Sequence, residues 1–271
     1  MGSGARQRPG GGGGSCRLYA GRSGGGFGGY ARRPMTVFVT RPEPDATRTV
    51  AALASAELKA IPTPLLDIVI ADAAAPPLAK GEALVFTSRN GVRAWSATGG
   101  ALTAPAYAVG TATAEAASEI GLTVADIGGG DVDTLLPVLM AAPATGFLHI
   151  RGRHSRGQLV ERLAATGRPA RGIPLYEAKA ATVLPAPLLD ALRAGETPHG
   201  PCRIALFSPR TATILLRLLD DCLGRISVPA QIFCLSPAVA AALDKDRFAQ
   251  VVIASEPTLP AFIDSLRSGS T

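Results

Sequence analysis

Short apolar runs alternate with amphipathic helical segments along most of this chain. The segment Ala83–Trp95 (ALVFTSRNGVRAW) shows the pattern clearly, because an apolar run ends at Phe86 and a helical pattern begins after Thr87-Ser88-Arg89. Such a run is typical of a buried strand that leads into the N-terminus of a helix. Since backbone N–H groups are free at a helix N-terminus and the helix dipole is positive there, the connecting loop is suited to bind an anion.

The same arrangement recurs, which indicates a duplicated architecture. The similar pairs are Ala83–Trp95 with Ile204–Leu216, Tyr107–Ala117 with Ile232–Ala242, and Thr36–Leu53 with Gly146–Leu163. Each member predicts a strand, a polar turn and a helix. Strands that alternate with helices are typical of parallel sheets, and such sheets bind ligands at the carboxyl ends of their strands.

Prolines add two further predictions. Pro137 and Pro260 lie at matching places in two helical tails, and we predict that both lie in the first turn, where the missing N–H is not needed. The segments Ile61–Ile70 and Ile173–Ala180 are extended and contain prolines, which are unsuited to a central strand in the first of them. Because these two segments flank one set of elements, we expect them to lie side by side as a hinge.

The predicted fold is therefore α/β, with two parallel-sheet domains that are related halves, one of them discontinuous, joined by a two-stranded hinge. Residues 35–62 and 180–271 form domain 1, residues 63–70 and 173–179 form the linker, and residues 71–172 form domain 2. Residues 1–34 are a Gly/Arg-rich extension, for which we expect disorder, because this composition buries too little apolar surface to offset ordering of the backbone.

The charge distribution argues against nucleic acid as a partner. The net charge is +6, but residues 1–34 contain six arginines and no acid, so the remainder is formally neutral. No apolar run approaches the roughly 18 residues that a membrane helix needs. The four cysteines show no CxxC spacing and the three histidines no HxxxH spacing, so we expect no metal site and the free thiols of a cytoplasmic protein.

The predicted loops are rich in hydrogen-bond donors and contain hardly any general base. No Ser–His–Asp pattern, Walker loop or paired carboxylates follow a strand. Each hydroxyl could equally be an N-cap and each arginine a solvated charge, but their recurrence in most loops favours binding of a polyanion. The substrate-binding candidates are Arg41, Ser88, Arg89, Thr111, Thr113, Arg151, Gly152, Ser208 and Ser236.

Tyr176 is a separate candidate, because it is the phenol of a predicted hinge segment. It is either a core aromatic that anchors the crossover or a donor that points into the cleft and assists a leaving hydroxyl.

From Met35 to its end, the chain resembles uroporphyrinogen-III synthases. The segments that carry the resemblance are VTRPEPD, LVFTSRNGV, AVGTATAEAA, FLHIRGRHSRGQLVERL, IPLYEA, ALFSPRTA and ASEPTLPAFIDSL, in this order. Each is modest alone, but their order and spacing over the whole body are specific. The resemblance implies two α/β domains joined by a two-stranded linker.

The resemblance also implies a hydro-lyase of tetrapyrrole (haem) biosynthesis. Its substrate is hydroxymethylbilane, a linear tetrapyrrole with eight carboxylates, which is cyclised to uroporphyrinogen III with inversion of the last pyrrole ring and loss of water. No cofactor or metal is implied. The protein is expected to act as a cytoplasmic monomer without membrane or nucleic acid, and a transient handover from hydroxymethylbilane synthase is a candidate partnership.

Individual residues carry the resemblance further. Tyr176 matches the family tyrosine thought to assist loss of the hydroxyl, Thr113 matches the threonine of a GxxT turn, and Ser88 and Ser208 match the serines of two strand–helix loops. One segment departs: Ser236-Pro237-Ala238-Val239-Ala240 stands where many members have Gly-Pro-Thr-Thr-Ala. The missing hydroxyls shift the expected role to backbone N–H groups and Ser236.

An alternative function remains compatible with the hinge and the loops. A non-catalytic two-domain α/β binding module for an anionic small molecule would share both features. Against it, residues 1–34 contain no apolar stretch typical of an export signal, and the repeated α/β pattern includes no DNA-binding domain of a regulator.

Overall fold

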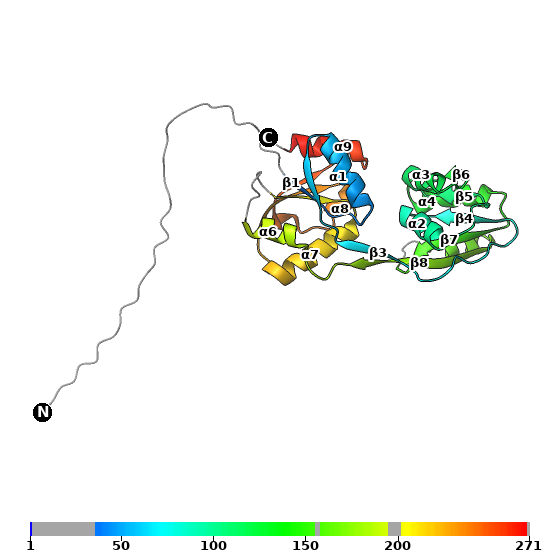
Figure 1. The fold of residues 1–271 in the computed structure, drawn as a ribbon, viewed down its shortest axis with the longest axis horizontal. Helices are drawn as coiled ribbons and strands as arrows, with labels where there is room; N and C mark the ends of the chain where they lie inside the picture. The colour runs from blue at the N-terminus through cyan, green and yellow to red at the C-terminus, as the bar shows by residue number, and fades with distance from the viewer. Residues whose placement is uncertain (2–35, 155–157, 195–201, 270–271) are drawn as a thin grey trace. The chain divides into compact units, whose positions relative to one another are not determined.

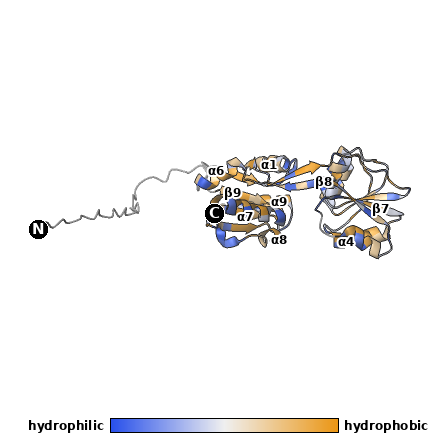
Figure 2. Ribbon diagram, turned by 90° about the horizontal axis from the view of Figure 1, so that it is seen from below, coloured by the Kyte–Doolittle hydropathy of each residue, from blue (hydrophilic) through white to orange (hydrophobic). Residues whose placement is uncertain are grey.

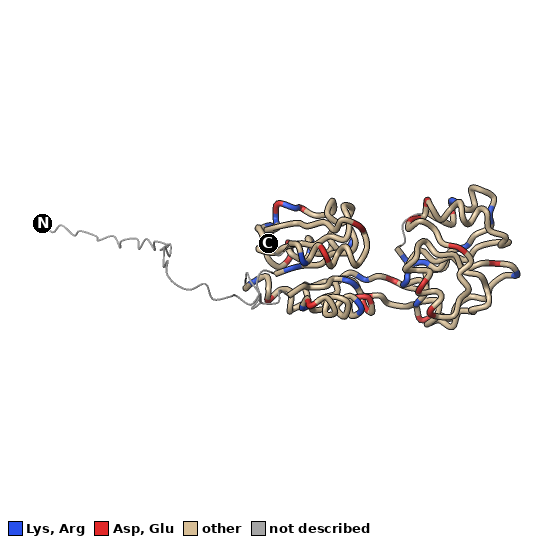
Figure 3. Tube along the Cα trace, turned by 90° about the horizontal axis from the view of Figure 1, so that it is seen from above, with Lys and Arg blue, Asp and Glu red and all other residues tan. Residues whose placement is uncertain are grey.

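The computed structural model describes residue 1 and residues 36–154, 158–194 and 202–269. The expectation of disorder for residues 1–34 therefore concerns a segment that lies, apart from Met1, outside the described residues. The described strands form two sheets (Figure 1). No helix in these ranges is long and apolar enough to cross a membrane. Lys and Arg are interspersed with Asp and Glu along the described chain (Figure 3).

The first sheet has five strands and is parallel throughout. Its order is β11 (Phe248–Ile253), β10 (Val228–Cys234), β9 (Cys202–Leu206), β1 (Thr36–Val39) and β2 (Lys59–Pro62). Val37 and Val39 pack with residues of α1 (Asp45–Ser55) and α9 (Leu259–Ser268). Phe38 packs with residues of α6 (Ala186–Ala194), α7 (Pro209–Leu223) and α8 (Pro237–Ala240), so both faces of the sheet are covered.

The second sheet has six strands, all parallel except for one antiparallel edge pair. Its order is β3 (Leu66–Ile70), β8 (Ala170–Ala180), β7 (Gly146–Gly152), β4 (Glu82–Phe86), β5 (Ala106–Ala108) and β6 (Val124–Ile127). The helices α2 (Arg89–Ala97) and α3 (Thr111–Glu119) contribute to one core cluster, and α4 (Val132–Ala141) and α5 (Leu159–Ala165) to the other. The helices carry both apolar and polar residues (Figure 2), as expected of helices with one face on a sheet.

The two sheets share one strand order, which confirms the prediction of related α/β halves. The order β2-β1-β9-β10-β11 in the first sheet matches β8-β7-β4-β5-β6 in the second. This correspondence pairs β9 and α7 with β4 and α2, and β1 and α1 with β7 and α5, as the sequence repeats predict. The registers agree as well, because paired residues are the same number of positions apart in both sheets: Thr36 lies opposite Lys59, and Phe147 lies opposite Ala170.

Several local predictions need correction. The extended segment Ile61–Ile70 is divided: β2 pairs with β1 in the first sheet, and β3 pairs with β8 in the second. Pro137 lies inside α4 beyond the first turn, so the helix lacks one N–H that it would otherwise use. Pro260 does lie in the first turn of α9. The helix α8 has only four residues, whereas its counterpart α3 has nine.

The two prolyl segments are paired with each other. Strands β3 and β8 run side by side and antiparallel, with Ile70 opposite Tyr176 (Figure 1). Pro62 lies on an edge strand and Pro64 lies between β2 and β3, in agreement with the expectation that prolines exclude a central strand. Whether this pair acts as a hinge, and where the two domains begin and end, stays a prediction.

Candidate active site

Ser88 and Tyr176 are in direct contact although 88 residues separate them in the chain. Ser88 is the N-cap of α2, and its Oγ accepts a hydrogen bond from the Gly91 N–H at 3.2 Å. The same Oγ lies 2.8 Å from the Tyr176 Oη. Tyr176 is half-buried on β8, at the carboxyl end of the segment that pairs with β7. The phenol therefore meets a capped helix N-terminus at the carboxyl ends of parallel strands.

Gly152 gives the ring of Tyr176 the space that it occupies. A Cβ atom at residue 152 would lie 3.1 Å from Cε2 and Cζ of Tyr176 and 3.4 Å from its Oη. The neighbouring Arg153 N–H donates a hydrogen bond to the Tyr176 carbonyl at 2.8 Å. Gly152 is thus placed to position the phenol.

Thr87 and His149 form a polar pair next to the Ser88 loop. His149 lies on β7 with only 4% of its surface exposed, and its Nε2 is 2.9 Å from the Thr87 Oγ1. Burial, with a further contribution from the charge of Arg151, lowers the pKa of His149 to about 4. The imidazole is therefore neutral at physiological pH, and the pair ties the end of β4 to β7.

A pocket of about 720 Å³ brings together three of the predicted substrate-binding residues, Arg41, Arg89 and Thr111. The rest of its lining comes from Gly110, Ala112, Gly128, Gly129, Gly130, Phe207, Leu235, Pro257, Thr258 and Leu259. The N-termini of α3 and α9 both reach it. Because the first N–H groups of a helix have no intrahelical partner and the dipole is positive there, the pocket suits carboxylates.

The two arginines of the pocket belong to an ionic cluster around Asp45. Arg41, Arg89 and Arg93 approach the Asp45 carboxylate to 3.6, 3.1 and 2.5 Å. The Asp45 side chain is only 9% exposed. Burial alone would raise the pKa of Asp45, but the hydrogen bond from Arg93 and the charges of the arginines outweigh it and hold that pKa below its usual value. Asp45 is therefore a carboxylate at neutral pH.

Arg41 is also held by an aromatic ring. Its guanidinium lies 4.8 Å from the centre of the Phe207 ring, a cation–π geometry. Burial lowers the pKa of Arg41. The positive charges of Arg89 and Arg93 lower the same pKa further, and the negative charge of Asp45 opposes this shift. An arginine stays protonated at neutral pH under such shifts, so the pocket keeps its positive charge.

Tyr176 and six of the nine predicted substrate-binding residues are not among those that line this pocket; the six are Ser88, Thr113, Arg151, Gly152, Ser208 and Ser236. Thr113 is buried within the first turn of α3. Arg151 turns back, and its Nη1 donates to the Gly152 carbonyl at 3.3 Å. Ser208 caps α7, and its Oγ lies 2.7 Å from the Thr211 Oγ1. Ser236 precedes the short helix α8 and follows Leu235, which does line the pocket.

The sequence prediction missed Asp45 and Arg93. Both pairs Arg41/Asp45 and Arg89/Arg93 are spaced four residues apart, a spacing typical of neighbours on a helix face, and this signal was available. The glycine loop before α4 was also visible in the sequence. However, the N–H groups of Gly128, Gly129 and Gly130 donate to Ala108, Thr134 and Val109, so they are not free for a ligand.

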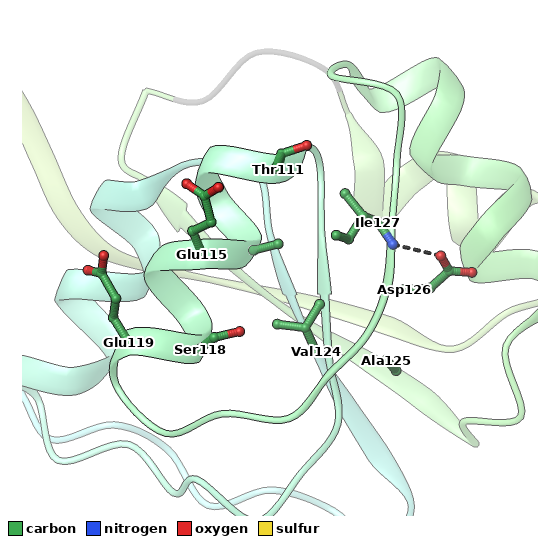
Figure 4. Close-up of a pocket in the computed structure, with 9 residues that line it drawn as sticks. Thr111, Glu115, Ser118, Glu119, Val124, Ala125, Asp126 and Ile127 are labelled. Carbon is green, nitrogen blue, oxygen red and sulfur yellow. Dashed lines mark hydrogen bonds between the residues drawn. The ribbon is translucent and has the colours of Figure 1, made fainter.

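A second groove lies between α3 and β6 (Figure 4). Its lining includes Glu115, Glu119 and Asp126, with Thr111 at the edge it shares with the first pocket. Three carboxylates disfavour an anionic ligand, so the pocket of Arg41 and Arg89 is the better candidate. Among the described residues, no group of three or more His, Cys, Asp or Glu side chains could hold a metal ion.

The described residues form a two-sheet α/β protein with a pocket, lined by Arg41, Arg89 and two helix N-termini, at the carboxyl ends of its strands. The chain belongs to the uroporphyrinogen-III synthase family, because the family model described as uroporphyrinogen-III synthase HemD matches residues 47–264. This confirms the family inferred from the sequence motifs. Members of the family are hydro-lyases of tetrapyrrole biosynthesis, and their activity is the formation of uroporphyrinogen III.

The chain is also similar to solved structures, one of which agrees with this assignment at the level of the fold. The crystal structure of uroporphyrinogen-III synthetase from Helicobacter pylori 26695 is 18% identical, with 87% of this chain and 99% of that chain covered and a TM-score of 0.57. A mutant uroporphyrinogen III synthase from the thermophilic bacterium Thermus thermophilus is 18% identical, with 86% and 98% covered and a TM-score of 0.49. A comparison with curated protein sequences gives no match.

Proposed function

We propose that the Ser88–Tyr176 pair and the pocket of Arg41 and Arg89 convert hydroxymethylbilane into uroporphyrinogen III. The observation that carries this assignment is the 2.8 Å contact between Ser88 Oγ and Tyr176 Oη. It places a phenol beside the loop that supplies Arg89 to a positively charged pocket. Hydroxyl loss needs a proton donor, and an octacarboxylate needs cations and N–H groups, so the two features match the two demands.

Ser88 sets the direction in which the Tyr176 proton points. The Gly91 N–H donates to the Ser88 Oγ, and a hydroxyl oxygen that accepts one bond still has its own proton to donate. When Ser88 donates this proton to the Tyr176 oxygen, the phenol proton is free for the substrate. The C–O bond of the substrate then breaks, its hydroxyl takes the Tyr176 proton and leaves as water, and the pyrrole nitrogen supplies electrons to the resulting azafulvene-like cation.

Ring closure then needs orientation more than further chemistry. The substituted α-carbon of the last pyrrole attacks the cation and forms a spiro intermediate. The bond from this carbon to its neighbouring methylene bridge then breaks and leaves a second azafulvene-like cation, which the free α-carbon of the inverted pyrrole attacks. A proton lost from that carbon restores aromaticity. That proton returns the Tyr176 phenolate to the phenol, so the net change is the loss of one water. The arginines and the helix N-termini hold the carboxylates while this happens, and such positioning supplies much of the rate enhancement.

We also propose a wider setting for this activity. Strands β3 and β8 act as the linker (63–70 and 173–179) between domain 1 (35–62 and 180–271) and domain 2 (71–172). The protein works as a cytoplasmic monomer without a cofactor, and hydroxymethylbilane reaches it by diffusion or by handover from hydroxymethylbilane synthase. Seven predicted site residues contribute where the bound substrate extends beyond the pocket, because they lie outside its lining: Ser88, Thr113, Arg151, Gly152, Tyr176, Ser208 and Ser236.

A coupled assay tests the proposed function directly. Hydroxymethylbilane is generated in situ, the purified protein is added, the products are oxidised, and the uroporphyrin isomers are separated by chromatography. The bilane closes spontaneously to isomer I, so a predominance of isomer III supports the proposal. Isomer I alone, formed in the presence of folded protein, would favour the alternative of a non-catalytic binding module for an anionic small molecule.

A further inference from the structure

We propose that Asp45 is a positioning residue for substrate binding, because it holds Arg41 and Arg89 ready at the edge of the pocket for the carboxylates of the substrate. This inference rests on the proposed function, since its ligand is the same octacarboxylate. Asp45 is among the most buried charged residues described, and it is not part of the pocket lining. Its effect on the substrate must therefore pass through the arginines.

The two carboxylate oxygens of Asp45 contact different arginines. Oδ1 of Asp45 accepts a hydrogen bond from Nη2 of Arg93 at 2.5 Å, and Arg93 is itself fixed by a bond from its Nη1 to the Asn90 Oδ1 at 2.8 Å. Oδ2 faces Nη2 of Arg89 at 3.1 Å and Nη2 of Arg41 at 3.6 Å. Arg93 thus anchors the carboxylate, and the other oxygen orients the two arginines of the pocket.

The charges of the cluster do not balance. Three guanidiniums surround one carboxylate, so two positive charges remain, and the two arginines that reach the pocket are half-buried. Each guanidinium has five N–H donors, and Asp45 engages one nitrogen of each pocket arginine. The remaining donors can bind a substrate carboxylate while Asp45 stays in place. We therefore expect Asp45 to assist binding and not to compete with the substrate.

The cluster also joins two distant parts of the chain. Asp45 is the first residue of α1, which covers the first sheet, whereas Arg89 and Arg93 lie on α2, which covers the second. Without the carboxylate, three like charges on long side chains repel one another and turn toward water. Substrate binding must then order these arginine side chains, which costs free energy. In the unmodified protein Asp45 already holds them, so this cost is absent.

The first test is the substitution Asp45→Asn, which keeps the shape of the side chain and removes its charge. We expect the KM for hydroxymethylbilane to rise about tenfold and kcat to change less than about twofold, since the arginines act in binding. Asp45→Glu should restore part of the affinity. Asp220→Asn is the matched control, because Asp220 pairs with Arg247 at 2.5 Å and neither residue lines the pocket. It should lower stability and leave KM unchanged.

A double-variant cycle shows whether Asp45 acts through Arg89. Arg89→Gln should weaken substrate binding strongly in the unmodified protein and only slightly in the Asp45→Asn background, because residues that act as one unit are not additive. Additive effects of the two substitutions, or a KM that falls in Asp45→Asn, would overturn the inference.

Binding of uroporphyrin III, a stable octacarboxylate, gives a readout that does not depend on turnover. Its affinity, followed by fluorescence, should fall about tenfold in Asp45→Asn and stay unchanged in Asp220→Asn. If the unmodified protein makes no isomer III but this difference persists, the proposed function fails and the positioning role stands. If isomer III forms but KM and the affinity for uroporphyrin III are unchanged in Asp45→Asn, the positioning role is wrong and the proposed function stands.

Discussion

Ser88 and Ser208 occupy equivalent positions in the two halves of the molecule, and they show how the halves differ. Both cap the helix that follows, each accepting a backbone N–H at 3.2 Å. The second contact of Ser208 is with the side-chain hydroxyl of Thr211, the same residue whose N–H it accepts, at 2.7 Å. The second partner of Ser88 is Tyr176, on another strand, at 2.8 Å. The same cap is therefore local in one half and joined to a phenol in the other.

The residues around the two serines also differ, being polar in the second half and apolar in the first. Thr87, before Ser88, bonds to His149 of β7, and the equivalent positions in the first half are Phe207 and Val39. Phe207 packs against Phe262, and its ring supports the Arg41 guanidinium. The second half thus has polar residues where the first has apolar ones. We infer that the proton chemistry lies in the second half, whereas the pocket walls and the two pocket arginines come from both halves.

Strand length also distinguishes the two halves at this place. Strand β2 has four residues and ends at Pro62, whereas its counterpart β8 has eleven and continues to Ala180. Tyr176 lies in the part of β8 that has no equivalent in β2, where the strand also pairs with β3. The longer strand of the second half therefore carries the phenol at this place.

Tyr176→Phe removes the phenol hydroxyl that distinguishes the second half from the first. Removal of the proton donor should lower kcat about a hundredfold, since general acid catalysis contributes roughly 10²–10⁴ in rate. The melting temperature should change little, because the ring remains. Tyr107→Phe is the control: this buried tyrosine on β5 packs edge-on against Phe147 and is not part of the site. An unchanged kcat in Tyr176→Phe would remove the phenol from the mechanism.

Ser88→Ala and Ser208→Ala compare the two caps directly. Each should lose about 1 kcal/mol of stability, the usual effect of an N-cap serine. Ser88→Ala should also lower kcat about tenfold, because a hydrogen bond to the developing phenolate contributes about that much, and Ser208→Ala should lower it less. Denaturant unfolding and the coupled assay give both quantities. Equal losses of turnover in the two variants would mean that the asymmetry has no functional role.

Gly152→Ala should move the phenol without removing it. The new Cβ atom would press on the Tyr176 ring at 3.1 Å, so the ring must shift and its 2.8 Å contact with Ser88 must change. We expect kcat to fall about threefold, because small displacements at a reacting group are costly, with a smaller change in KM. Gly146→Ala, on the same strand, is the control, since the three atoms nearest to its Cβ, at 3.3 to 3.9 Å, all belong to Pro169 and not to Tyr176. Equal kinetics of the two variants would contradict a positioning role for Gly152.

His149→Gln should act on stability and leave turnover at neutral pH nearly unchanged. The folded pKa of His149 is about 4 and its ordinary value is 6.5, so the unfolded chain binds the proton more readily. Stability should therefore fall as the pH drops from 6.5 to 4, by about 3 kcal/mol for this residue. His149→Gln should flatten this slope in denaturant unfolding. His154→Gln, at an exposed side chain, should keep it.

The sequence by itself determined the class of fold, the repeated halves and the loops that carry the site. These features depend on local periodicity and on turn residues, which neighbouring positions in the chain specify. Helix ends followed from local signals as well: α3 stops before Gly121, whose φ of 92° favours glycine. Local signals did not predict the location of Pro137 or the shortness of α8, because packing against the sheet decides how far a weak helical pattern extends.

Only the tertiary structure decided which loop residues meet. Ser88 reaches Tyr176, and Arg89 and Arg93 reach Asp45, across 88, 44 and 48 positions of the chain. Two strand orders that interleave distant segments create these contacts, and no periodic pattern encodes that order. The sequence therefore indicated Tyr176 as a candidate, but its partner Ser88 and the carboxylate that organises the arginines became visible only once the sheets were assembled.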